Sequence, residues 1–286
     1  MINFKSSYTF QNVLLLYKGM PYTIENLTAD IFNTIRSRPQ GMYSGRALGN
    51  SANAAMWTSD KIQQFYNGIV TAFNLFMTGM ELTDFARLIV CECAQESTLS
   101  WDLGVKPVVL TDHTSQGIIQ TTPGSVLLDY SNYGTPICDV TGKIVLNPRT
   151  VTSLDLADPG VCIIIWAFYN TNSVKMGVSM SEYENRIAWN IPVGGVTKVY
   201  ANLMETWLSG PHNDVVKNPK SAQGFQDYYL RILDYYTVSG YGSKTEFDAL
   251  LATPVNDNIL AMYTTQNNTI DNRDTVFGTE CIGVYP

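Results

Sequence analysis

Hydrophobic residues in this chain recur at intervals of three and four positions, and that spacing predicts a mainly helical protein. Such intervals place apolar side chains on one face of an α-helix, where they can pack against a core. Capping residues indicate where helices begin: Thr58 or Ser59, Thr83 and Asp158 open periodic segments, and Pro159 suits a first helical position. The predicted helices cover residues 59–79, 83–96, 159–169, 194–208 and 228–233.

Other segments lack this periodicity. The stretch 143–146 predicts a short strand in a region interrupted by Gly and Pro, whereas residues 1–57 are hard to assign. We expect a mainly α fold with minor β structure (α+β). Its predicted parts are a partly helical N-terminal extension at 1–79, a central domain at 80–238 and an irregular C-terminal extension at 239–286. The last of these is expected to pack on the domain or to dock to a partner.

Composition limits the possible partners. Hydrophobic residues make up 45% of the 286, enough for a sizeable core, and charged residues make up only 15%, against about 25% in average soluble proteins. The net charge is −7, and no cluster of Lys and Arg could contact phosphates. We therefore expect no nucleic-acid partner, and an anionic polymer would have to be held by hydrogen bonds and stacking.

No segment predicts a membrane span. The longest apolar stretch is 161–168, whereas a spanning helix needs about 20 residues. The first residues lack the basic region and apolar core of a secretory signal. Our expectation is a protein that acts outside the cell after release by lysis, or as part of a virion.

The cysteines and histidines do not form a metal-binding pattern. Cys91 and Cys93 diverge on their helix, Cys162 lies in an apolar helix, and the two histidines are far from each other in sequence. We predict no metal and no cofactor, and we expect most thiols to be buried and reduced. A disulfide between Cys138 and Cys281 is left open by the sequence.

Glu96 is the candidate catalytic carboxylate. It continues the apolar stripe of Phe85, Ile89 and Cys93 at the end of the 83–96 helix, so we expect it to be half-buried. Burial would raise its pKa, which suits an acid that donates a proton. The alternative is a structural carboxylate paired with a basic side chain. Glu92, one turn earlier, would raise the pKa of Glu96 further if the two lie close together, or it could be structural.

Several sequence blocks resemble the lytic transglycosylase and goose-type lysozyme superfamily. Glu96-Ser97 is similar to the Glu-Ser of the family's catalytic acid, and Gly117-Ile118-Ile119-Gln120 is similar to its Gly-Leu-Met-Gln segment. Thr121-Thr122-Pro123 resembles the residues that come directly after that segment in the transglycosylases. The resemblance implies a lysozyme-like catalytic domain at 80–238 that cleaves a glycosidic bond.

Two further blocks occur in the family's order. Ala188-Trp189-Asn190 resembles the family's Ala-Tyr-Asn, and 228–233 resembles its closing Tyr-Val helix. Trp189 stands where Tyr is usual, and Ile191-Pro192 stands where Ala-Gly is usual, so the sugar contacts there are expected to differ.

The chemistry that the resemblance implies has two branches. Both cleave the β-1,4 bond between N-acetylmuramic acid and N-acetylglucosamine in peptidoglycan, with Glu96 as the acid. In lytic transglycosylases the same Glu then removes the proton of the sugar's 6-hydroxyl and a 1,6-anhydro ring closes, whereas goose-type lysozymes deliver water. Asp112 lies about where the goose-type enzymes carry an Asp, so it is a candidate catalytic residue for hydrolysis. Alternatively Asp112 caps a loop, an interpretation that applies equally to Asp102.

Other side chains are expected to contact the substrate. Tyr228 and Tyr229 are adjacent on a helix and cannot both face inward, so only one of them can hydrogen-bond Glu96. Instead of contacting substrate, Gln120 could cap a local turn and Trp189 could fill the core. The candidate binding residues are Ser115, Gly117, Gln120, Trp189, Asn190, Tyr228 and Tyr229.

A rival interpretation comes from another class of protein. A catalytically idle lysozyme-like module could bind glycan or serve as a structural component of a virion, with its termini docked to virion proteins. The presence of Glu96, Gln120 and Asn190 together favours an enzyme, because an idle fold has no physical need for that combination.

Overall fold

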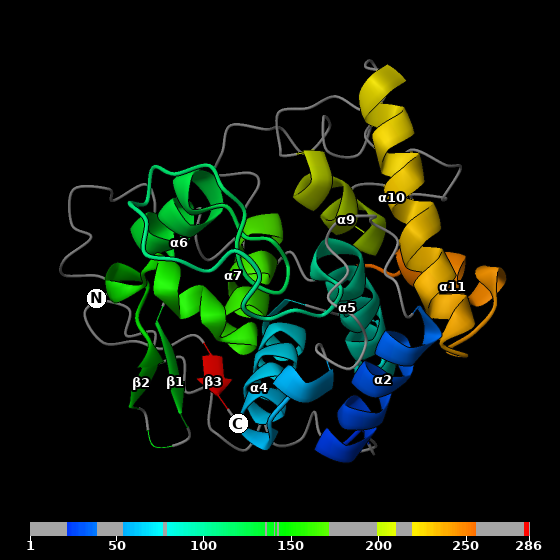
Figure 1. Cartoon of the computed structure of the whole chain (residues 1–286), viewed down its shortest axis with the longest axis horizontal. Helices are drawn as coiled ribbons and strands as arrows, with labels where there is room; N and C mark the ends of the chain where they lie inside the picture. The colour runs from blue at the N-terminus through cyan, green and yellow to red at the C-terminus, as the bar shows by residue number, and fades with distance from the viewer. Residues whose placement is uncertain are drawn as a thin grey trace, which may run out of the picture.

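The computed structural model describes residues 22–38, 54–76, 79–134, 136–139, 141, 143–171, 199–209, 219–255 and 283–285. The described part is mostly helical with one small sheet (Figure 1), which confirms the mainly α prediction. Its α-helices are α2 (Ile24–Ser37), α4 (Ser59–Phe76), α5 (Leu82–Ser97), α6 (Leu128–Tyr133), α7 (Pro159–Thr171), α9 (Tyr200–Ser209), α10 (Pro219–Val238) and α11 (Lys244–Leu251). A π-helical turn (Pro123–Leu127) and two 3₁₀ turns (Pro148–Thr150 and Ser153–Ala157) complete the helical elements.

Helix α5 is the centre of the fold. It packs against α2, α4 and α10, and α4 packs in turn along α7. The predicted stripe is buried, with Phe85, Leu88 and Ile89 all at 0% exposure. The predicted cap is wrong, because the helix begins at Leu82 with Glu81 as its N-cap instead of Thr83. Packing of the apolar face, more than the cap, therefore sets where this helix lies.

Helix α7 behaves as its sequence predicts. The carboxylate of Asp158 accepts hydrogen bonds from the backbone N–H groups of Gly160 at 2.8 Å and Val161 at 3.1 Å. Its middle, 162–168, is apolar on every side and nearly inaccessible, as expected for a helix enclosed by others. None of the described helices is both long enough and apolar enough to cross a membrane.

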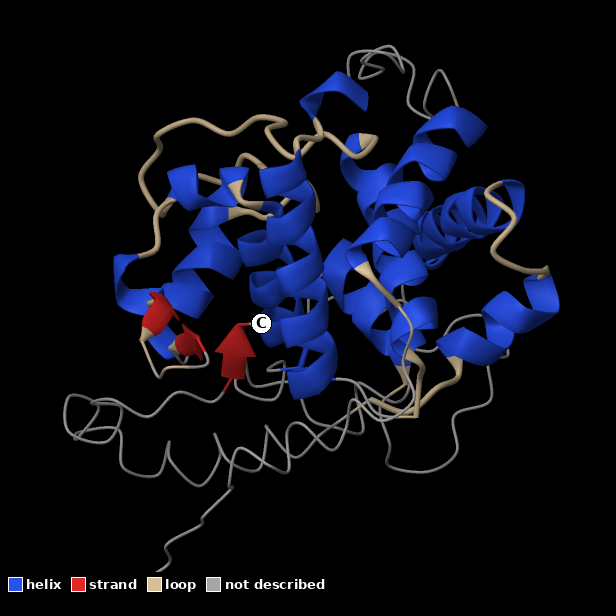
Figure 2. Ribbon diagram, turned by 90° about the horizontal axis from the view of Figure 1, so that it is seen from below, coloured by secondary structure: helices blue, strands red, loops and turns tan. Residues whose placement is uncertain are grey.

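The sheet lies at one edge of the helical body (Figures 1 and 2). Its strand order is β2-β1-β3, with β1 (Ile137–Asp139) antiparallel to β2 (Ile144–Leu146) and parallel to β3 (Gly283–Tyr285). The strand predicted at 143–146 is confirmed as β2. Because β3 lies near the end of the chain and also contacts α4, it attaches the last described residues to the domain.

Two helices fall in segments where we predicted none. Helix α2 lies within 1–57, and α11 lies within the tail that was expected to be irregular. Both begin with a capping box, Thr23 with Asn26 and Ser243 with Glu246, in which each side chain bonds the other residue's backbone N–H. The Ser-x-x-Glu spacing at 243–246 was a readable signal that hydrophobic periodicity did not reveal.

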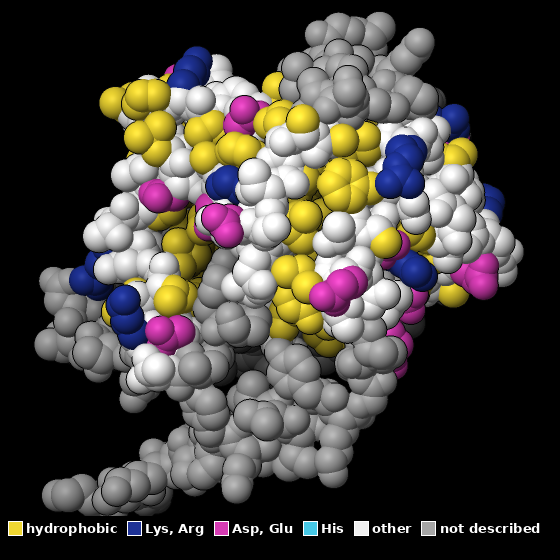
Figure 3. All heavy atoms as spheres, turned by 60° about the horizontal axis from the view of Figure 1, so that its bottom comes forward, with side chains coloured by type: hydrophobic (Ala, Val, Ile, Leu, Met, Phe, Trp, Pro, Cys, Tyr) yellow, Lys and Arg dark blue, Asp and Glu magenta, His cyan; other side chains and the backbone are white. Residues whose placement is uncertain are grey.

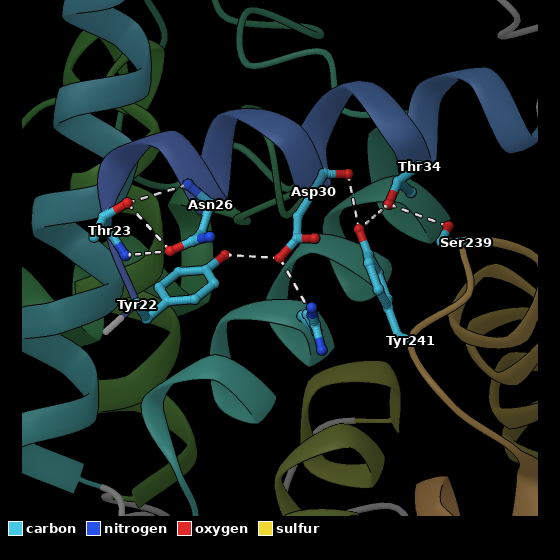
Figure 4. Close-up of polar contacts among 8 residues, drawn as sticks. Tyr22, Thr23, Asn26, Asp30, Thr34, Ser239 and Tyr241 are labelled. Atoms are coloured by element: carbon cyan, nitrogen blue, oxygen red, sulfur yellow. Dashed lines mark hydrogen bonds and ion pairs between the residues drawn. The ribbon is translucent and has the colours of Figure 1, made fainter. Parts of the chain in front are cut away.

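Helix α2 is held to the rest of the fold by a polar cluster around Asp30 (Figure 4). The Asp30 carboxylate accepts hydrogen bonds from the Tyr22 hydroxyl at 3.0 Å and from Nε of Arg87, on α5, at 3.3 Å. The Tyr241 hydroxyl, just after α10, donates to the Asp30 carbonyl at 2.8 Å and lies 2.7 Å from the Thr34 hydroxyl. Burial raises the pKa of Asp30, and Arg87 and Tyr22 oppose that rise.

The thiols divide into two groups. Cys91, Cys93 and Cys162 are free and buried, so the prediction of reduced buried thiols is confirmed for them. Cys138, on β1, is disulfide-bonded. Cys281 lies outside the described residues.

Removing the Tyr241 hydroxyl should loosen α2. We expect Tyr241→Phe to lower the free energy of unfolding by about 1–2 kcal/mol, because two buried polar partners lose a hydrogen bond. The matched control is Tyr236→Phe, since Tyr236 packs its ring against Tyr241 at 5.8 Å and against Phe247 at 5.2 Å. Urea unfolding of both variants measures the difference, and equal stabilities would contradict a role for the Tyr241 bonds.

Candidate functional site

Glu96 lies in the last turn of α5 and is half-buried, as predicted. Beyond it the backbone leaves the helix through two left-handed residues, Thr98 with φ 57° and Leu99 with φ 61°. Gln120 is also left-handed, with φ 58°. These three are the non-glycine residues of positive φ in the described chain, and all three flank one junction. Strained backbone of this kind clusters at functional sites, where the surrounding structure maintains it.

The hydroxyl of Ser97 joins the two sides of that junction. Its oxygen lies 2.6 Å from the carbonyl oxygen of Ile118 and 3.0 Å from that of Cys93, one turn back. It also accepts a hydrogen bond from the backbone N–H of Ser100 at 3.2 Å. Ser97 is 2% exposed, so these bonds form away from solvent. The residue after Glu96 thus fixes the 117–120 segment against the end of α5.

The 117–120 segment is a tight loop closed by backbone pairing of Gln116 with Thr121. Gly117 donates to the carbonyl of Leu103 at 2.9 Å, and the Gln120 side-chain amide donates to the carbonyl of Gly117 at 2.9 Å. Gln120 therefore caps its own turn, the alternative that the sequence left open, while its side chain stays half-buried. This loop is the one that the resemblance placed beside the catalytic acid.

Trp207, on α9, also binds the 117–120 loop. Its indole N–H donates to the carbonyl of Ile119 at 3.0 Å, and its ring meets Tyr169 edge-on at 5.9 Å. Ile118 and Ile119 are both at 0% exposure, so the loop is anchored by apolar contacts as well as by hydrogen bonds.

Gly117 must be a glycine for two separate reasons. Its φ is +76°, and a Cβ atom would lie 2.7 Å from the carbonyl oxygen of Leu156 and 2.8 Å from the sulfur of Cys162. Only a residue without a side chain avoids both the strain and the collision.

The carboxyl of Glu92 lies one turn before Glu96 and is completely buried. Its Oε1 accepts a hydrogen bond from the Tyr200 hydroxyl, on α9, at 2.5 Å. Burial raises the pKa of Glu92 to about 8; the Tyr200 hydrogen bond opposes the rise, and the charge of Glu96 adds to it. Glu92 is therefore a neutral acid at pH 7.

Tyrosines face both carboxyl groups. The Tyr200 ring packs edge-on against Phe85 at 6.3 Å and lies 6.1 Å from Trp166, which holds its hydroxyl on Glu92. Tyr228, on α10, is buried, and its hydroxyl makes no hydrogen bond of normal length to any described residue. It is close enough to Glu96 that burial and then this carboxylate raise the pKa of Tyr228 well above its usual value. A tyrosine thus lies near each carboxyl, and the charge of Glu92 also acts on Tyr228.

Tyr228 and Tyr229 separate as expected for adjacent helical residues. Tyr228 faces Glu96, whereas the Tyr229 hydroxyl donates to Asp248, on α11, at 2.5 Å. The Tyr229 ring also meets Phe247 at 5.6 Å. Tyr229 is therefore a contact between α10 and α11, and its role as a substrate-binding residue stays a prediction.

Asp112 is a loop cap. Its Oδ1 accepts from the backbone N–H of Thr114 at 2.7 Å and from the Thr114 hydroxyl at 2.6 Å. These hydrogen bonds lower the pKa of Asp112. The alternative interpretation of Asp112 as a capping residue matches these contacts, and its catalytic role stays a prediction.

The remaining candidates divide between the described and undescribed chain. Ser115 is exposed beside the loop, with its hydroxyl 3.3 Å from that of Thr122. Trp189 and Asn190 lie outside the described residues, so their roles stay predictions. We did not predict Tyr200 as a site residue. It shares the helical spacing of Leu203 and Trp207, and a Tyr in such an apolar stripe usually packs in the core.

No protein-family model, curated protein or solved structure matches this chain. Among the residues that the structure describes, no group of three or more His, Cys, Asp or Glu side chains could hold a metal ion. The site must therefore be interpreted from its own geometry: a half-buried carboxyl at a helix end, a neutral acid behind it, and a rigid loop beside it.

Gly117→Ala should destabilise the protein more than the same change at Gly240. Both glycines have φ +76°, but nothing lies within 4 Å of a Cβ at Gly240. We expect about 1 kcal/mol of backbone strain at Gly240 and about 2–4 kcal/mol at Gly117, where the clash is added. Thermal unfolding of the two variants isolates the clash, and equal losses would show that the loop does not need this close approach.

Glu92→Gln should change how stability depends on pH. Because the folded protein keeps the Glu92 proton up to about pH 8 while the usual pKa is 4.5, stability falls as pH rises through that window. Gln has no such titration, so the wild type should lose up to about 5 kcal/mol relative to the variant between these limits. Denaturant titrations from pH 4 to pH 9 measure the difference, and a constant difference would contradict a buried neutral acid.

Proposed function

We propose that this chain is a peptidoglycan-degrading muramidase with a lysozyme-like catalytic domain, in which Glu96 is the general acid. The observation that carries the proposal is the Ser97 junction: Glu96 stands at the end of a buried helix, and Ser97 bonds Ile118 at 2.6 Å in the adjacent Gly117–Gln120 loop. Tyr228 approaches the same carboxyl from α10. The family resemblance implies these neighbours, and periodicity alone would not bring them together.

The proposed reaction begins with proton transfer from Glu96 to the glycosidic oxygen between N-acetylmuramic acid and N-acetylglucosamine. The bond from that oxygen to the anomeric carbon breaks, and the substrate's own N-acetyl group stabilises the positive carbon. Glu96, now a carboxylate, removes the proton of the 6-hydroxyl, whose oxygen closes on the anomeric carbon to give a 1,6-anhydro ring. One carboxyl thus acts as acid and then as base.

The anhydro-forming branch is favoured over hydrolysis. Hydrolysis of the goose-type kind needs a second carboxylate to hold water, and the Asp112 candidate is engaged with Thr114. Glu92 cannot take that role at neutral pH, because its raised pKa of about 8 leaves it uncharged. Lytic transglycosylase activity is therefore the leading form of the proposal, and goose-type hydrolysis is the alternative.

The surface accords with binding through hydrogen bonds and apolar contacts. On the face shown in Figure 3, Lys, Arg, Asp and Glu side chains are scattered among hydrophobic side chains and the white atoms of other residues and backbone. A glycan chain offers hydroxyl, amide and apolar ring faces, which such a surface can contact without charge pairing.

Glu96→Gln should abolish clearing of purified peptidoglycan. Loss of a general acid slows a reaction by about 10²–10⁴-fold, and the amide keeps the size of the side chain. Glu81→Gln is the matched control, since Glu81 is the exposed N-cap of the same helix and its change removes the same charge. Turbidity measures the rates. Undiminished clearing by Glu96→Gln would remove Glu96 as the acid, and no clearing by the wild type would favour the idle glycan-binding module.

Mass spectrometry of the released muropeptides distinguishes the two branches. The proposal predicts 1,6-anhydro ends, which are one water lighter than reducing ends. Reducing ends alone would assign the protein to the hydrolytic branch and would require another group to hold the water.

A further inference from the structure

Glu92 is a titratable group that the proposed reaction does not use. It has no exposed surface, and Tyr200 donates to its Oε1 at 2.5 Å. Its Oε2 is buried and forms no hydrogen bond with any residue that the structure describes. Gln could also accept the Tyr200 hydrogen bond through Oε1, but only a carboxyl can ionise at this position.

The position of Glu92 relative to Glu96 is fixed by the helix. Residues four apart lie on one face of an α-helix, with their Cβ atoms about 5–6 Å apart. The surrounding titratable groups come from three helices: Tyr200 from α9, Tyr228 from α10, and Glu96, Cys93 and Cys91 from α5 itself.

Two charged groups on the other neighbours of α5, Asp30 and Lys61, are engaged elsewhere. Asp30, on α2, is bound by Tyr22 and Arg87. Lys61, on α4, donates to Gln64 and to the Ala157 carbonyl. None of these contacts involves Glu92, whereas the charge of Glu96 acts on it directly.

We propose that Glu92 is a positioning residue for the reaction proposed above, coupled to Glu96 one turn away so that ionisation of Glu92 holds the proton on the catalytic acid. The coupling is reciprocal by linkage: because a charged Glu96 disfavours ionisation of Glu92, an ionised Glu92 favours the protonated form of Glu96 by the same factor. At neutral pH Glu92 is uncharged and the effect is absent. Above about pH 8 Glu92 ionises, and the acid form of Glu96 persists further into the alkaline range than it would beside a neutral residue.

The pH profile of kcat/KM tests this coupling. Each rate is divided by the same protein's rate at pH 5, so that a general loss of activity in Glu92→Gln cancels. The normalised ratio of wild type to Glu92→Gln should stay flat to about pH 7 and then rise, by about tenfold at pH 9 for a coupling of one pK unit. Glu81→Gln should match the wild type throughout. A ratio that stays flat to pH 9 overturns the inference.

Unfolding of the Glu92→Gln variant would not produce this rise in the activity ratio. By about pH 8 Glu92→Gln is expected to have gained stability relative to the wild type and to keep that gain at higher pH, so a ratio that rises there cannot come from loss of folded variant. Tyr200→Phe supplies a second test. It removes a hydrogen bond that favours the charged form of Glu92, so the rise in activity that depends on Glu92 ionisation should move to higher pH. A rise that moves to lower pH, or does not move, contradicts the assignment.

Stability measurements separate failure of this inference from failure of the proposed function. Glu96→Gln removes the charge that raises the pKa of Glu92, so the pH-dependent loss of stability should end at a lower pH in this variant than in the wild type. If that shift occurs and the wild type does not cleave peptidoglycan, the coupling between Glu92 and Glu96 is supported and the proposed function is wrong. If the wild type cleaves peptidoglycan and the shift is absent, the function stands and the coupling fails.

Discussion

The hydrogen bond between the Ser97 hydroxyl and the Ile118 carbonyl is the interaction on which the geometry of the site depends. At 2.6 Å and away from solvent, it joins the end of α5 to a loop that lies a long stretch of sequence later. The left-handed residues Thr98, Leu99 and Gln120 on its two sides are a conformational cost that this contact and the indole of Trp207 help to offset. The junction therefore sets which loop lies beside Glu96.

The electrostatics of the site depend on the depth at which α5 is buried. Glu92 lies far enough inside to remain neutral at pH 7, whereas Glu96 lies at the edge of the core and is half-buried. Two carboxyl groups on one helix face thus differ in burial, which is a usual way in which the members of a pair acquire different roles. Tyrosines from α9 and α10 reach this pair: Tyr200 donates to Glu92, and Tyr228 lies near Glu96.

Helices α4, α5, α7 and α10 were predictable from their apolar stripes. Helix α2 carries such a stripe too, in the buried residues Leu27, Ile31 and Ile35, but we left its segment unassigned. Helix α11 is short, and its clearest sequence signal is its capping box. Proximity of Glu96 to the 117–120 loop came from the family resemblance, since no periodicity links segments so far apart. Tyr200 was hidden in an apolar stripe, and only the three-dimensional packing shows that Tyr228 faces Glu96 while Tyr229 binds Asp248.

A structure of Glu96→Gln with a bound peptidoglycan tetrasaccharide would test the central claim most directly. If Glu96 is the acid, the side-chain amide of residue 96 will lie within hydrogen-bonding distance, about 2.7–3.2 Å, of the oxygen that links N-acetylmuramic acid to N-acetylglucosamine. The sugar rings will then run beside the Gly117–Gln120 loop. A glycan bound elsewhere on the protein, or a linkage oxygen out of reach of residue 96, would contradict the assignment of this junction as the catalytic site.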